Sequence, residues 1–100
     1  SKGMLSEAET RIVHRLFQDY GQDIDEKDLT AALEIAGTIT EDDAATVERQ
    51  VTTRERQRQL LRLIKRKCHS GLGPLVSFFE ESAQSHIVEW LSRALRAVEE

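Results

Sequence analysis

Residues 52–67 read TTRERQRQLLRLIKRK and form the longest run of good helix formers in the sequence. Thr52 followed by Glu55 predicts a capping box, in which each side chain accepts a hydrogen bond from the backbone amide of the other residue. The apolar side chains share one face of the predicted helix: Leu60, Leu61 and Ile64. Four arginines at i, i+4 spacing form a row on the opposite face: Arg54, Arg58, Arg62 and Arg66. We therefore expect a helix with an apolar inner face and a strongly basic outer face.

Three shorter amphipathic segments precede this helix, over residues 5–20, 25–36 and 40–49. Their apolar residues recur with the helical period, and Gly21 and Gly37 mark the ends of the first two. Capping boxes are expected at Ser6 with Glu9 and at Thr40 with Asp43. The residues expected to point inward in the first two segments are Leu5, Ala8, Ile12, Val13, Leu16, Phe17, Tyr20, Leu29, Ala32, Leu33 and Ala36.

Residues 68–74, CHSGLGP, interrupt the helical pattern, and Pro74 is well placed as the first residue of a fifth helix. A sixth helix begins after Ser85. The residues expected to point inward in these two helices are Leu75, Phe78, Phe79, Ala83, Ile87, Val88, Leu91, Ala94, Leu95 and Val98. Trp90 lies at the edge of the last apolar stripe, where packing is the favoured role. None of six short helices can bury its stripe alone, so they are expected to pack as an all-α, antiparallel bundle.

The composition fits one small domain. The chain has 100 residues, of which 39% are hydrophobic, and a net charge of −4. No apolar run approaches the roughly 20 residues of a membrane-spanning helix. The single cysteine, Cys68, cannot form an internal disulfide and favours a reducing compartment, the cytosol or the nucleus. We expect a cytoplasmic location. Residues 1–3 read as a cloning remnant or a linker, which leaves residues 4–100 as the domain.

Residues 52–67 resemble the fourth helix of caspase-recruitment domains, which is threonine-led and carries an arginine and paired leucines. Residues 78–82 (FFEES) and 84–91 (QSHIVEWL) are similar to the family's aromatic fifth helix, polar turn and apolar sixth helix. Residues 39–43 (ITEDD) resemble the start of its third helix. The resemblance implies a compact six-helix bundle of the death-fold type. Death-effector and death domains remain alternatives, because the turn over residues 68–74 is longer, and the first helix shorter, than in the caspase-recruitment pattern.

The charges are sorted along the sequence. Residues 23–48 contain nine acidic residues and one basic residue, whereas residues 49–67 contain eight basic residues and one acidic residue. The row of like charges on the fourth helix costs an isolated helix roughly 0.2 to 0.5 kcal/mol per pair. One interpretation is a solvated face whose charges pair within the monomer. The other is a pair of complementary surfaces that meet head to tail between molecules.

The resemblance implies the second interpretation, because caspase-recruitment domains join an acidic surface to a basic one. The expected basic surface comprises Arg11, Arg15, Arg54, Arg58, Arg62 and Arg66. The expected acidic surface comprises Asp25, Asp28, Glu41, Asp42 and Asp43. The implied partners are other death-fold domains, either copies of this chain or a caspase or adaptor in cell-death or inflammatory signalling.

Nucleic-acid binding through the basic fourth helix is the alternative function. The acidic half of the chain and a pI near 5.4 count against it, because they weaken steering toward DNA.

The sequence does not favour a calcium site, a zinc site or a catalytic site. Asp23, Asp25 and Glu34 match three positions of a calcium loop, but Asp28 stands where that loop needs glycine. Cys68 and the three histidines lack the paired spacing of a zinc site, and nothing supplies an oxyanion site beside the thiol. We expect no catalytic residue, cofactor or metal.

Overall fold

Each of the six predicted helices is present in the computed structural model, which describes residues 5–99. The expectation for residues 1–3 lies outside the described residues. The elements are α1 (Glu7–Tyr20), the 3-10 helix η1 (Gly21–Asp23), α2 (Glu26–Ile35), α3 (Glu41–Glu48), α4 (Thr53–Lys67), α5 (Gly73–Glu81) and α6 (Ser85–Glu99). No strand occurs between residues 5 and 99. The all-α class is therefore confirmed for this part of the chain, and η1 is the one helical element that the sequence did not indicate.

The predicted capping boxes define three helix starts. Ser6 with Glu9, Thr40 with Asp43, and Thr52 with Glu55 each form both reciprocal hydrogen bonds. At α2, the carboxylate of Asp25 accepts hydrogen bonds from two backbone amides of the first turn. These contacts satisfy amides that have no partner within the helix, so local sequence chemistry fixes where the helices begin.

Two helix ends use left-handed backbone. Gly37 follows α2 with φ 78°, as expected of a glycine that stops a helix. Ala83 follows α5 with φ 59°, and its side chain is exposed. The prediction that Ala83 points inward is wrong, because α5 ends at Glu81 and the chain turns before reaching Ala83.

The buried core draws on every α-helix. Its fully buried side chains include Leu16, Leu29, Val47, Leu60, Leu75, Phe79, Ile87 and Leu91. Two further residues expected inside are outside: Ala36 is exposed just beyond α2, and Val98 is 45% exposed near the end of α6. Trp90 is half-buried and packs edge-on against the ring of Tyr20, with 5.8 Å between the two ring centroids. The packing role predicted for Trp90 is therefore confirmed.

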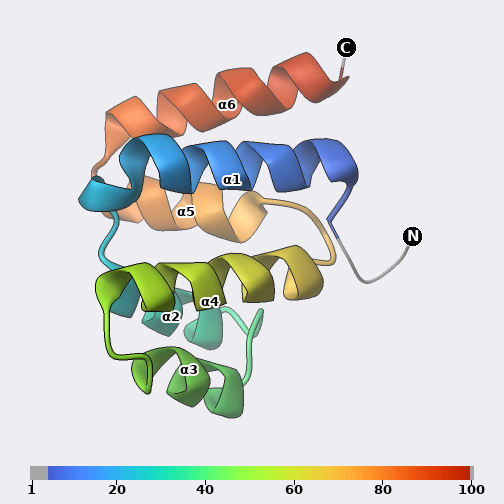
Figure 1. The fold of residues 1–100 in the computed structure, drawn as a ribbon. Coiled ribbons are helices and arrows are strands. Elements are labelled where there is room, and N and C mark those ends of the chain that lie inside the picture. The colour runs from blue at the N-terminus through green and yellow to red at the C-terminus, as the bar shows by residue number, and fades with distance from the viewer. Residues whose placement is uncertain (1–4, 100) are drawn as a thin grey trace.

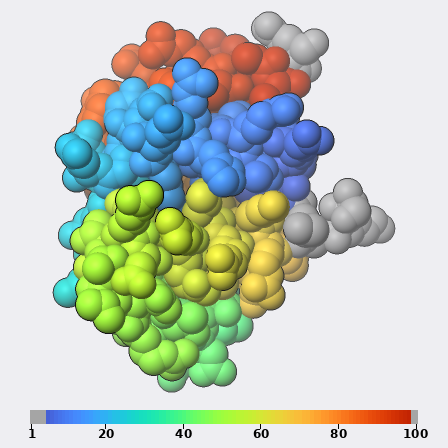
Figure 2. Space-filling model, in the orientation of Figure 1, coloured from blue at the N-terminus to red at the C-terminus, as the bar shows by residue number. Residues whose placement is uncertain are grey.

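The arrangement of the helices decides which surfaces are available. In Figure 1, α1 lies between α6 on one flank and α4 on the other, with α5 behind it. Helix α3 packs against α2 and α4 at the far end of the bundle. The outer faces of α1 and α4 share the side of the molecule seen in Figure 2. No helix among residues 5–99 has the length and apolar content needed to cross a bilayer.

Candidate protein-interaction surfaces

The arginines spaced four residues apart along α4 are exposed to solvent. They are Arg54, Arg58, Arg62 and Arg66. Within the described residues, none of these guanidinium groups forms an ion pair with a carboxylate. Because like charges at i, i+4 repel one another, the row raises the free energy of the monomer. We call these four residues the arginine row.

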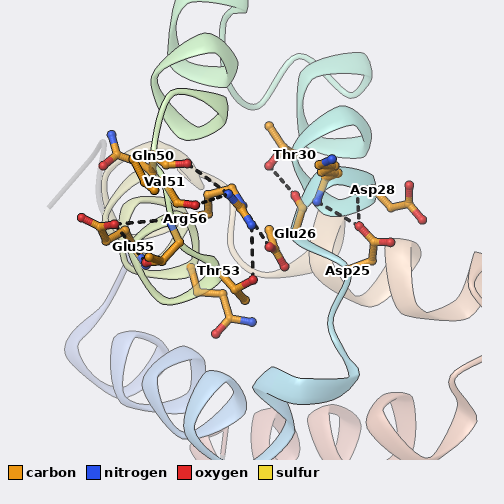
Figure 3. Close-up of polar contacts among 12 residues, drawn as sticks. Asp25, Glu26, Asp28, Thr30, Gln50, Val51, Thr53, Glu55 and Arg56 are labelled. Atoms are coloured by element: carbon orange, nitrogen blue, oxygen red, sulfur yellow. Dashed lines mark hydrogen bonds and ion pairs between the residues drawn. The ribbon is translucent and has the colours of Figure 1, made fainter.

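Arg56 lies on the same helix but points into the molecule. Its Nε pairs with Glu26 Oε1 at 3.0 Å, and the two side chains are only 20% and 12% exposed. Its Nη1 also donates to the carbonyl oxygens of Gln50 and Val51, at 3.0 and 3.2 Å (Figure 3). Arg56 thus joins α4, α2 and the turn before α4, and its charge is neutralised inside the chain.

Asp43 was predicted to belong to the acidic surface, but its carboxylate is bound within the chain. Its Oδ2 accepts hydrogen bonds from the backbone amide of Thr40 at 3.0 Å and from Lys67 Nζ at 2.9 Å. The Thr40 amide, helped by Lys67, holds the pKa of the Asp43 carboxyl below its usual value, although burial opposes this shift. Asp43 therefore joins α3 to α4 and does not contribute a free charge to the surface.

The other predicted acidic residues are exposed but fall into two groups. Asp25 and Asp28 lie at the start of α2, whereas Glu41 and Asp42 lie at the start of α3. The chain reverses between these helices, so their N-termini lie at opposite sides of the bundle in Figure 1. The prediction of one acidic surface is therefore corrected to two separate acidic groups.

Arg11 and Arg15 also lie apart from the arginine row. Each makes an exposed ion pair within α1, to Glu7 at 3.7 Å and to Asp19 at 3.5 Å. Exposed pairs of this kind contribute little to stability, about 0.3 to 0.5 kcal/mol. Both arginines line a groove between α1 and α6, together with Ala8, Ile12, Trp90 and Val98. They therefore lie toward α6, while α4 runs along the other flank of α1 (Figure 1).

Cys68 is buried in the core. The thiol is 2% exposed, and burial, with a smaller contribution from the nearby charge of Glu9, raises its pKa to about 11. The reactive thiolate is therefore scarce at neutral pH. Among residues 5–99, no three His, Cys, Asp or Glu side chains are grouped so as to hold a metal ion.

Sequence similarity covers almost the whole bundle. The chain resembles part of Cell death protein 4. It is 34% identical over 87 residues to the Caenorhabditis elegans protein and 33% identical over 92 residues to the Caenorhabditis briggsae protein. These matches take up 87% and 92% of this chain but only 14% and 16% of the relatives' lengths. No model of a known protein family matches the chain.

Proposed function

We propose that this chain is a death-fold interaction module of the caspase-recruitment type, which binds modules of the same fold in cell-death signalling. Three observations support the proposal: the six-helix bundle, the similarity to part of Cell death protein 4, and the arginine row. The arginine row carries most of the argument. It is exposed, it lies on one rigid helix, and no described carboxylate of the same chain neutralises it.

The proposed mechanism is docking of an acidic surface on the arginine row. Carboxylates of a partner relieve the repulsion among the guanidinium groups, and bidentate pairs add directionality. Two exposed acidic groups on this chain, at the starts of α2 and α3, supply the reciprocal charge for a neighbour. The arginine row and the acidic groups are different patches. A copy that has docked through one of them therefore still offers the other to the next copy.

The partner class follows from the same chemistry. A second copy of this chain, a caspase or an adaptor fits if it carries a death-fold domain with an exposed acidic surface. The proposal therefore covers self-association and recruitment of a different partner, in apoptosis or in inflammatory signalling of the inflammasome type. Binding to a partner of this kind requires no cofactor.

Charge reversal tests the proposal. Arg58→Glu and Arg62→Glu are expected to abolish association while leaving helicity and thermal melting nearly unchanged, because both side chains point to solvent. Arg96→Glu, at an exposed arginine on α6, is the matched control and is expected to associate like the wild type. Light scattering at low salt measures self-association, and pull-down of a death-fold partner measures recruitment. Binding that survives both reversals in both assays would falsify the proposal.

Nucleic-acid binding remains the second candidate, because the same exposed row could contact phosphates. The net charge of −4 and the carboxylates of α2 and α3 oppose it. A duplex retarded in a gel by the wild type but not by Arg58→Glu, with a steep loss of binding on adding salt, would favour this function over association between modules.

A further inference from the structure

Ile35, the last residue of α2, is 88% exposed, which makes it the most exposed large apolar side chain in the described part of the chain. A single exposed apolar side chain is common on folded proteins, but Ile35 is not isolated. It borders a hollow of about 440 Å³ between α2 and α5. Apolar residues make up most of the lining: Ala32, Ile35, Ala36, Pro74 and Phe78. We call this hollow the α2–α5 groove.

The spacing of the lining residues gives the groove two walls. Ala32 and Ala36 lie one helical turn apart at the end of α2, and Pro74 and Phe78 lie one turn apart on α5. Because the alanine side chains are small, they do not fill the space between the walls. A helix of another chain can lie along such a groove, with its aliphatic side chains at i, i+3 or i+4, and i+7 placed between the walls.

The helices that form these walls are acidic. Residues 16–48 and 68–92, which contain α2 and α5, include one lysine, Lys27, and no arginine. Glu26 is bound to Arg56 inside the chain. The remaining carboxylates of the two helices are exposed, and none of them is in an ion pair within residues 5–99: Asp28, Glu34, Glu80 and Glu81. Four carboxylates against one lysine leave the two helices with a net charge of −3.

The neighbouring elements do not offset this negative charge. Glu41 and Asp42, at the start of α3, are exposed carboxylates. Lys67 reaches the start of α3 from α4, but its ammonium group is bound to Asp43. The arginine row lies on the outer face of α4, opposite the side chains that pack into the core. A ligand of the α2–α5 groove therefore gains most if it carries its own cations.

We propose that the α2–α5 groove binds a basic amphipathic helix of a partner protein. Aliphatic side chains of that helix enter the groove beside Ile35, and its lysines or arginines meet Glu34, which precedes Ile35, and Glu81, which lines the groove. The basic helix of this chain, α4, is not such a ligand, because its apolar residues Leu60 and Ile64 are buried.

Synthetic peptides made of leucine and lysine test this contact in the 100-residue chain. The probe has about 14 residues, with leucines at i, i+3, i+4 and i+7 and lysines on the opposite face. One control peptide has the same composition in a scrambled order, and another has glutamate in place of lysine. The probe is expected to bind at least tenfold more tightly than either control, as measured by fluorescence anisotropy of labelled peptide. Its binding is expected to shift amide NMR signals of α2 and α5.

Substitutions in the groove locate the contact. Ile35→Ser removes the exposed aliphatic side chain, and Glu81→Lys places a cation where the proposed ligand is basic. Each is expected to weaken binding of the probe about tenfold or more. Val98→Ser and Glu89→Lys, at an exposed valine and an exposed glutamate of α6, are the matched controls and are expected to bind like the wild type. All four side chains are exposed, so circular dichroism is expected to show unchanged helicity.

Arg58→Glu distinguishes this contact from the arginine row. The groove does not rest on the function proposed for the row, so this variant is expected to bind the probe like the wild type. A probe that does not bind, a scrambled peptide that binds as tightly, or an Ile35→Ser variant that binds like the wild type overturns the proposal. Shifts in α2 and α5 that appear when the protein alone is concentrated assign the groove to a second copy, and they overturn it too.

Discussion

Arg56 and Arg58 stand two positions apart on α4 and have opposite surroundings. Arg56 is 20% exposed and pairs with Glu26, whereas Arg58 is exposed and has no carboxylate partner among residues 5–99. Arg56→Ala is expected to lower the free energy of unfolding by about 3 kcal/mol, because it leaves Glu26 buried without its counter-charge. Urea denaturation followed by circular dichroism measures the change.

Arg58→Ala is the control for this loss, since it changes an exposed side chain on the same helix. Its expected effect on the free energy of unfolding lies within about 0.5 kcal/mol. Equal losses for the two alanine variants would contradict the internal role assigned to Arg56.

The sequence indicates in part why Arg56 points inward and Arg58 points outward. Arg56 lies four residues before Leu60, and Leu60 four before Ile64, so helical phase alone places Arg56 on the inner face. Its partner could not be predicted in the same way. Glu26 lies thirty residues away in the sequence, and only the packing of α2 against α4 brings the two side chains together.

At the scale of helices, the start of α3 depends on a carboxylate with two roles. Asp43 completes the capping box with Thr40 and pairs with Lys67 of α4. Asp43→Asn is expected to lower the free energy of unfolding by about 1 to 2 kcal/mol at neutral pH, since a hydrogen-bonded charge is lost. Asp42→Asn, at an exposed carboxylate in the same turn, is expected to change it little.

The loss at Asp43 should depend on pH. The pKa of the folded-state carboxyl lies below its usual value of 3.8, so the unfolded chain binds the proton more readily. The contribution of Asp43 is therefore complete above the usual pKa and disappears as the pH falls through the lowered one. Urea titrations at decreasing pH should show the wild type and Asp43→Asn converging in acid. A difference that stays constant with pH argues against this role.

Helix boundaries were largely predictable, because capping residues are local. Two failures come from places where the chain changes direction. Ala83 fits an apolar stripe by spacing, yet α5 has already ended when the chain reaches it. Asp28 and Glu41 belong to one acidic stretch of sequence, but the reversal between α2 and α3 separates them in space. Neither outcome is encoded in spacing alone.

At the scale of the molecule, the net charge of −4 conceals separate charged patches. If the arginine row binds an acidic partner, association should weaken about tenfold or more between roughly 0.01 M and 0.15 M salt, as the Debye length falls from about 30 to about 8 Å. Static light scattering across this range measures the effect. Arg62→Glu is expected to show no association at any of these salt concentrations, because the reversal removes the contact at the row. Wild-type association that is insensitive to salt would indicate that the row is a solvated face.

The sequence could predict the basic side of the candidate site better than the acidic side. The arginine row lies on one helix, so its geometry follows from i, i+4 spacing. The remaining predicted residues come from several helices. The structure places Arg11 and Arg15 beside α6 and pairs Asp43 with Lys67, and both results depend on how the helices pack.

The edge-on contact between Tyr20 and Trp90 has a practical consequence. The chain has a single tyrosine and a single tryptophan, and their ring centres lie 5.8 Å apart. Excitation energy absorbed by Tyr20 can therefore pass to Trp90 as long as α1 and α6 stay packed. Intrinsic fluorescence thus reports the integrity of this helix pair without an added dye, and it distinguishes a variant that has unfolded from one that has only lost its partner.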